Sequence, residues 1–184
     1  MPEQLYFTED AEANSLLASD PLALLIGFAL DQQVTVQKAF SSPLELKRRL
    51  GGRFDAEEIA GMDGTALEQV FREKPALHRF PGAMATRVQE LCRTVVSDYG
   101  GDAASVWEGV ADGDELRARI GALPGFGEMK IKALGSVLAK RFGIEAAQAL
   151  VPGHPTLGDV DSAEALERYQ EQKRAHKAKL RAQA

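Results

Sequence analysis

The chain has 184 residues, of which 45% are hydrophobic and 27% charged, and a formal net charge of −5 at pH 7. This balance is ordinary for a soluble globular protein of one domain or two small lobes. No apolar run approaches the roughly 18 to 20 residues of a membrane span, and the acidic N-terminus is unlike a targeting peptide. The single cysteine, Cys92, excludes an internal disulfide and an iron–sulfur cluster held by four cysteines of one chain. We therefore expect a cytoplasmic protein.

The N-terminal part of the chain predicts short and strongly apolar helices. A helix is expected over residues 10–18. Asp20 then serves as an N-cap with Pro21 at the first helical position, which opens an apolar helix up to Leu30. The buried stripe of that helix is interrupted by Asp31-Gln32-Gln33, whose polar side chains need partners or a function.

The middle of the chain continues with helices separated by proline and glycine. We expect Ser41-Ser42-Pro43 to break the chain and to cap a helix over residues 44–50. Further helices are predicted over residues 55–60, 66–73 and 83–99, with a loop over residues 75–81. No alternation of period two appears, so the sequence predicts an all-α fold. Cys92 lies on the apolar stripe of the long helix and is expected to be buried.

Two further helices, joined by a short glycine turn, follow. The first, over residues 113–122, runs into Pro124, and the second carries an apolar stripe up to Gly143. Gly125 and Gly127 between them permit a positive φ and a close approach of the backbone to a ligand. The exposed N–H groups at the start of the second helix would favour an anion such as a nucleic-acid phosphate.

The string Leu-Pro-Gly-Phe-Gly at residues 123–127 resembles the helix-hairpin-helix of the HhH-GPD superfamily of DNA glycosylases, relatives of endonuclease III and the alkyladenine glycosylases. The resemblance covers residues 22–143. It implies a two-lobed all-α fold without the iron–sulfur cluster. Residues 22–143 would form the core lobe, residues 1–21 with 144–184 the second lobe, and DNA would bind between them.

The resemblance also implies roles for single residues. Gln33, with Gln32 as the second choice, would fill the gap left by an extruded base; the alternative is that these amides hydrogen-bond neighbouring backbone. Gly125, Phe126 and Gly127 would bind the DNA backbone. The family's lysine position holds Met129 here, which weakens a lyase activity. Lys130 and Lys132 are then expected to contact phosphate or solvent.

The catalytic carboxylate is expected after the second hairpin helix. The family's usual separation from Gly127 lands on Ala147, within an apolar helix-like run over residues 144–151. The next loop offers Asp159 as the first candidate and Asp161 as the second, although Asp161 with Ser162 could instead cap a helix over residues 163–169. Asp31 and His154 are lesser candidates.

The charge of the C-terminal segment adds to this interpretation. Residues 168–184 carry six Lys or Arg and one Glu, a local charge of +5, so the remaining chain carries −10. This segment either attracts phosphates or is a solvated helix whose charges serve solubility.

The sequence thus predicts a monofunctional DNA repair glycosylase that hydrolyses the N-glycosidic bond of a damaged base. Its partner would be double-stranded DNA containing that base, with no membrane and no obligate protein partner. No cofactor or metal is expected, because the three histidines are far apart in sequence and have no ligand-spaced neighbours. The family allows a monovalent cation beside the hairpin carbonyls. The alternatives are a non-catalytic DNA-binding or repair-accessory protein and a helical protein–protein module.

Overall fold

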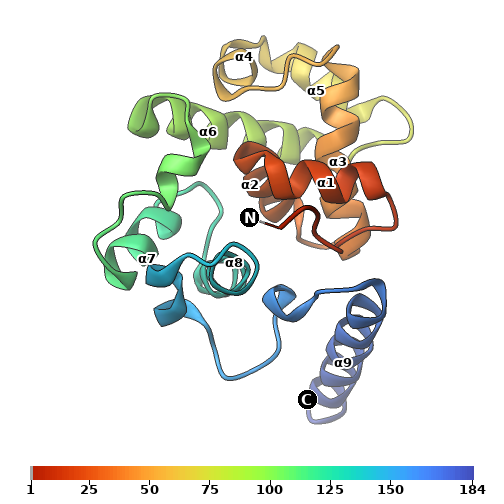
Figure 1. Cartoon of the computed structure of the whole chain (residues 1–184). Helices are drawn as coiled ribbons and strands as arrows, with labels where there is room; N and C mark the ends of the chain where they lie inside the picture. The colour runs from red at the N-terminus through yellow and green to blue at the C-terminus, as the bar shows by residue number, and fades with distance from the viewer. Residues whose placement is uncertain (1) are drawn as a thin grey trace.

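The computed structural model describes residues 2–184, and this part of the chain is all-helical, with no strand. The predicted all-α class is therefore confirmed. The elements in chain order are α1 (Ala11–Ser19), α2 (Pro21–Leu30), α3 (Val36–Arg49), α4 (Ala56–Gly61), α5 (Gly64–Arg72), α6 (Pro81–Tyr99), η1 (Ala103–Val106), α7 (Gly113–Gly121), α8 (Glu128–Lys140), η2 (Glu145–Leu150), η3 (Leu157–Asp159) and α9 (Ala163–Ala182), where η marks a 3₁₀ helix (Figure 1).

Helix α2 lies at the centre of the molecule. It begins as predicted: the Asp20 carboxylate accepts hydrogen bonds from the N–H groups of Leu22 and Ala23, and Pro21 follows the cap. Every residue of α2 after Pro21 is buried. Within residues 2–184 no single helix is both long and apolar enough to cross a membrane; α1 and α2 reach the necessary length only together, across a bend of 114°.

The expected chain break at Pro43 is wrong, because Pro43 lies inside the continuous helix α3. Proline lacks an N–H group and disturbs the carbonyl groups of the preceding turn. Here the hydroxyl of Ser42 donates to the carbonyls of Lys38, at 2.7 Å, and Leu77, at 2.8 Å, and Ser41 also donates to Lys38. These bonds and the buried apolar face of α3 keep the helix continuous across the proline.

One hydrophobic core joins the N-terminal and C-terminal parts of the chain. It extends from Leu5 and Phe7 through α2, α6 and α8 to Leu166. Phe40 of α3 packs edge-on against Phe7, with ring centroids 4.9 Å apart, and against Phe28 of α2, at 5.0 Å. Cys92 is fully buried, as predicted, and burial raises the pKa of its thiol to about 12, so this sulfur is a neutral core atom.

The two segments expected to share a second lobe pack on different elements. Helix α1 packs against α2 and α3, whereas η2 packs against α7 and α8, and η3 against α8. The apolar run over residues 144–151 forms the 3₁₀ helix η2 rather than an α-helix. In Figure 1, α9 extends from the lower part of the molecule, away from α4 and α5 at the top.

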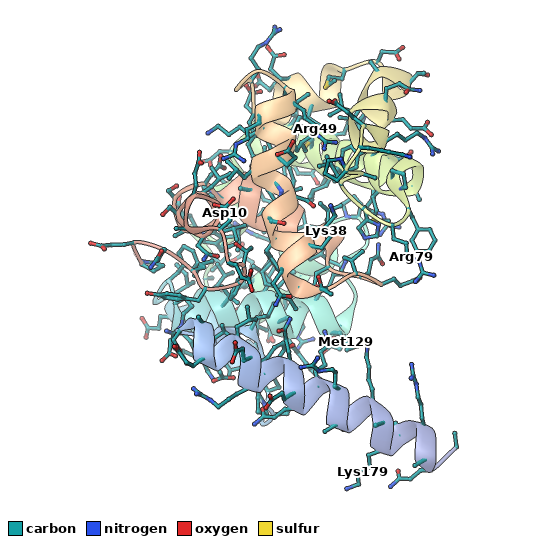
Figure 2. All side chains as sticks on the ribbon, turned by 90° about the vertical axis from the view of Figure 1, so that its right-hand side faces the viewer. Asp10, Lys38, Arg49, Arg79, Met129 and Lys179 are labelled. Atoms are coloured by element: carbon teal, nitrogen blue, oxygen red, sulfur yellow. The ribbon has the colours of Figure 1, made fainter. Side chains whose placement is uncertain are left out.

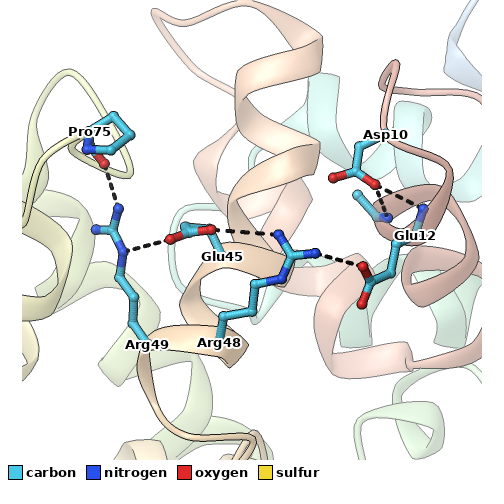
Figure 3. A network of polar contacts seen from close by, with 7 residues as sticks. Asp10, Glu12, Glu45, Arg48, Arg49 and Pro75 are labelled. Carbon is cyan, nitrogen blue, oxygen red and sulfur yellow. Dashed lines mark hydrogen bonds and ion pairs between the residues drawn. The ribbon is translucent and has the colours of Figure 1, made fainter.

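A network of polar contacts fixes the loop that precedes α6 (Figure 3). The Arg49 guanidinium, from a side chain only 6% exposed, donates to the carbonyls of Val70, Glu73 and Pro75 and pairs with Glu45 at 3.1 Å. Arg48 pairs with Glu12 of α1 at 2.6 Å. Helix α3 thereby positions residues 73–80, which lead to the candidate site.

Candidate nucleic-acid interface

A short glycine turn joins α7 to α8, as predicted, although only one of its two glycines has a positive φ. Gly125 has a φ of +81°, and the N–H of Phe126 donates to the carbonyl of Leu123 at 3.1 Å. Gly127 is the N-cap of α8, with φ −87° and ψ −173°, and it offers no side chain to cap the helix. The first N–H groups of α8 therefore keep their capacity for an outside acceptor.

A cation from another helix covers this turn. The Arg87 guanidinium of α6 lies so close to Gly125 that a Cβ atom there would collide with it. Arg87 is half-buried and forms no ion pair with any residue that the structure describes. Its charge is thus free beside the hairpin amides. Arg87 was not predicted as a site residue, because the sequence shows only that it lies beside the apolar stripe of α6.

Phe126 is not a surface residue, which corrects its expected place in a DNA-binding surface. Its side chain is 4% exposed and belongs to the hydrophobic core. It anchors the hairpin to the body of the protein, and only the backbone of the turn faces outward. Contact with DNA at this position would involve the main chain.

Met129 and Lys130 point in different directions from the first turn of α8. Met129 is 85% exposed, whereas Lys130 is half-buried. The Lys130 ammonium donates to the carbonyl of Ala29 in α2 at 3.2 Å and lies 5.6 Å from the centre of the Phe126 ring. This contact brings the hairpin to the carboxyl end of α2, so the two predicted segments meet. Lys132, by contrast, is a surface side chain 3.8 Å from Glu128.

In the polar turn after α2, one glutamine is exposed to solvent and the other contacts α6. Gln33 is exposed and has a φ of +56°, a left-handed conformation that is uncommon for a residue with a side chain. The Gln32 amide lies 3.2 Å from the sulfur of Met84. Gln33, the first choice from the sequence, is therefore the glutamine that projects outward.

His78 connects this turn to the start of α6. Its side chain is buried, and its Nε2 lies 3.0 Å from the carbonyl oxygens of both Leu30 and Gln32. The N–H of Phe80 donates to Nδ1 at 3.0 Å, so Nδ1 carries no proton and Nε2–H is the donor. Sequence reasoning gave His78 no role. Phe80 is 41% exposed, and the guanidinium of Arg79 lies over its ring at 5.3 Å.

Helix α9 contributes basic side chains to the same region. Gln170 exchanges two hydrogen bonds with Gln37 of α3, at 3.0 and 2.6 Å, which fixes the first half of the helix. Residues 171–184 are all exposed. Figure 2 shows this half of α9 extending below Met129, with Lys179 near its end.

Asp31, the C-cap of α2, is affected by the charges of α8 and α9. Burial raises the pKa of its carboxyl group, and the charges of Lys173, Lys130 and Lys177 oppose that rise. Burial likewise lowers the pKa of the Lys130 ammonium, against the charge of Asp31. The pKa of the Tyr169 hydroxyl is raised by burial and by Asp31. Groups from α2, α8 and α9 thus lie within electrostatic reach of one another.

Asp159, the first choice for a catalytic carboxylate, has a structural partner instead. It pairs with Lys140 and accepts a hydrogen bond from the N–H of Thr156 at 2.8 Å, closing a capping box on η3. Burial acts to raise its pKa, but the bonds from Lys140 and Thr156 prevail and lower it. Lys140 follows Lys130 by about 15 Å along α8, so the position of Asp159 gives no support to a role beside the hairpin.

The remaining candidates are surface residues. Asp161 is exposed, and Ser162 rather than Asp161 caps α9 by accepting from the N–H of Ala165 at 3.1 Å. His154 is exposed beside Pro155. No group of three or more His, Cys, Asp or Glu side chains suited to a metal ion occurs among residues 2–184.

Comparisons with protein-family models, with curated proteins and with solved structures found no match. The function of this chain is therefore inferred from its own residues and their geometry.

Proposed function

We propose that this protein is a DNA repair glycosylase that binds double-stranded DNA and hydrolyses the N-glycosidic bond of a damaged base without lyase activity. The observation that supports this most directly is the bond from the Lys130 ammonium to the Ala29 carbonyl. It joins a glycine hairpin suited to a phosphate with a polar turn suited to a displaced base, although 101 positions separate the two residues in the sequence.

The hairpin would bind the DNA backbone through its main chain. The uncapped N–H groups at the start of α8 and the guanidinium of Arg87 beside Gly125 present donors and positive charge to one phosphate. The lysines of α9 would bind further phosphates. A chain whose overall charge is −5 needs local positive charge of this kind to bind phosphate.

Gln33 would occupy the space left in the base stack. A glycosylase must rotate its target nucleotide out of the duplex, at a cost of a few kcal/mol. The exposed Gln33 amide can hydrogen-bond the base that loses its partner. His78 and Met84 hold the preceding Gln32, so the turn that presents Gln33 is supported from two sides.

A base-release assay tests this proposal. Short duplexes, each with one lesion (uracil, hypoxanthine, 3-methyladenine, 8-oxoguanine or thymine glycol), are incubated with the protein and divided. One half is heated in alkali to reveal abasic sites, and the other is treated with borohydride to trap a Schiff base. Cleavage that requires alkali supports the proposal. Trapping that disappears in Lys130→Ala would instead identify a lyase.

Arg87→Ala and Arg53→Ala form a matched pair in a measurement of duplex affinity. Both remove one cation, but Arg53 is exposed and has no place in the candidate interface. We expect Arg87→Ala to weaken duplex binding about tenfold or more, since a charge-assisted contact to phosphate is lost, and Arg53→Ala to leave it unchanged. Equal effects of the two substitutions would count against the hairpin as the phosphate site.

A non-catalytic DNA-binding protein is the second candidate. Two observations favour it: Met129 stands where the related hairpins carry a lysine, and Asp159 is engaged with Lys140 and Thr156. Steeply salt-dependent duplex binding without base release from any lesion would support this alternative.

A further inference from the structure

We propose that Asp31 is the catalytic carboxylate of this site. The inference rests on the proposed glycosylase function and adds the residue that would act on the sugar. A carboxylate is required there because breaking the glycosidic bond leaves positive charge on C1′ of the sugar, as in other glycoside hydrolyses.

Asp31 lies close to both parts of the interface. It directly precedes Gln32 and Gln33 in the turn after α2. Its charge acts on Lys130, whose amine also feels the charge of Arg87. The Lys130 ammonium of α8 bonds the carbonyl of Ala29, two residues before Asp31, and Arg87 covers Gly125, so the carboxylate, the hairpin and the outward glutamine lie in one neighbourhood. A phosphate on the hairpin would thus bring its nucleotide close to Asp31.

The side chain of Asp31 also has no structural task. Six aspartates cap helices with their carboxylates: Asp10, Asp20, Asp55, Asp63, Asp102 and Asp112. Asp159 pairs with Lys140, and Asp98 accepts from Ser97. Asp114 and Asp161 are exposed. Among the aspartates of residues 2–184, Asp31 alone is partly buried with a carboxylate that has no hydrogen bond or ion pair.

The charges near Asp31 fit the same role. Burial raises the pKa of the Asp31 carboxyl group, and the charges of Lys173, Lys130 and Lys177 oppose that rise and favour the ionised form. In a complex these lysines would pair with phosphates on either side of the target nucleotide. The negative charge of Asp31 would then act on the sugar, and the bound DNA would exclude water from the pair, which makes such a charge more effective.

The reaction balances with these groups. The bond between C1′ and the base nitrogen breaks, and its electron pair leaves with the base. The oxygen of a water molecule bonds to C1′, and Asp31 accepts one proton of that water. The proton then passes to solvent or to the departing base, which leaves an abasic sugar and restores the carboxylate. The balance needs no oxidant or reductant.

Binding of two abasic-site analogues tests the inference independently of the lesion. One duplex carries a pyrrolidine, which is cationic at neutral pH and resembles the charged sugar, and the other carries a neutral tetrahydrofuran. We expect the wild-type protein to prefer the pyrrolidine about tenfold or more, because a carboxylate meets its charge. Asp31→Asn should abolish the preference and keep the affinity for tetrahydrofuran within about threefold.

Three further variants complete the test. Asp31→Glu retains the charge and should retain much of the preference, while Asp159→Asn and Asp161→Asn should leave it unchanged. Where a substrate lesion is found, Asp31→Asn should lower the single-turnover rate of base release about 100-fold or more, with duplex affinity unchanged. Circular dichroism of each variant establishes that the fold is intact.

The outcomes separate the inference from the function on which it rests. A wild-type preference for pyrrolidine that persists in Asp31→Asn would overturn the assignment of Asp31 and leave the glycosylase proposal standing. Equal binding of both analogues by the wild type would also overturn the assignment and would favour the non-catalytic protein. Absence of salt-dependent duplex binding would instead overturn the proposed function itself.

Discussion

His78 holds Gln32 through its ring: Nε2 lies 3.0 Å from the Gln32 carbonyl oxygen and equally far from that of Leu30. The opposite nitrogen accepts from the N–H of Phe80 at 3.0 Å. One neutral imidazole therefore connects the turn after α2 with the loop before α6. The ring therefore contacts the backbone of Phe80 and of the residue directly before Gln33, and both Gln33 and Phe80 have exposed side chains.

Replacing His78 with alanine should destabilise the protein by about 3 kcal/mol, because buried backbone groups that the ring satisfies lose their partner. Urea unfolding at neutral pH measures this change. His154→Ala is the matched control, since that histidine is exposed, and its effect should stay within about 0.5 kcal/mol. Similar losses for both variants would contradict the structural role of His78.

Stability should also depend on pH through His78. Burial lowers the pKa of its imidazole below the usual 6.5, although the carbonyls of Leu30 and Gln32 act in the opposite direction. The unfolded chain therefore takes up this proton first as the pH falls. The contribution of His78 is complete above about pH 6.5 and is lost as the pH falls below that value.

The unfolding free energies of wild type and His78→Ala, compared from about pH 7.5 to about pH 5.5, isolate this contribution, because the other titrating groups are common to both proteins. The difference between the two proteins should shrink toward the acidic end. A constant difference would show that the His78 proton is not linked to folding.

The two hairpin glycines should respond differently to alanine. Gly125 has a φ of +81° and lies against Arg87, so Gly125→Ala should cost about 1–2 kcal/mol of stability and displace the guanidinium. Gly127 has a φ of −87° and open space where a Cβ atom would lie, so Gly127→Ala should leave stability unchanged. Thermal unfolding of the two variants checks this difference.

Gly127→Ala is then the informative variant for function. In a stable protein, the added methyl group would stand where a phosphate approaches the start of α8. Duplex affinity should therefore fall although unfolding is unaffected. Unchanged affinity in this variant would argue against main-chain binding of phosphate at the hairpin.

Removing Lys173 and Lys177 should change how DNA binding depends on salt. If each lysine neutralises one phosphate, the double alanine variant should reduce the slope of log affinity against log salt by about 2. Fluorescence anisotropy over a series of salt concentrations measures the slope. The double variant Arg53→Ala with Arg93→Ala removes the same charge from exposed positions elsewhere and should keep the wild-type slope.

Local patterns predicted most of the helices. Asp20 with Pro21 marked the start of α2, and Gly100 ends α6 in a left-handed conformation, as glycine there allows. Pro43 was misinterpreted because the helix is maintained by distant groups: the hydroxyl of Ser42 reaches the carbonyl of Leu77, 35 positions away. Such a contact has no local signature.

The candidate site was predicted only where it follows from local sequence. The hairpin at residues 123–127 is a contiguous string, and its turn geometry follows from the order of its glycines. The environment of Asp31 depends instead on α8 and α9, which are about 100 and 140 residues further along the chain. Phe126 was expected to bind DNA, and its burial was not foreseen because a hydrophobic residue between glycines gives no indication of the direction of its side chain.

Two different interactions act on α9. Hydrogen bonds between the neutral amides of Gln37 and Gln170 attach it to α3, whereas the positive charges of its lysines attract a polyanion. Hydrogen bonds between neutral amides respond little to ionic strength, whereas the lysines further along the helix are screened by it. Raising the salt concentration should therefore weaken the pull of α9 on a polyanion while the first half of the helix stays docked on α3. A change in salt concentration would therefore alter the affinity of this helix for a polyanion without altering its position on the protein.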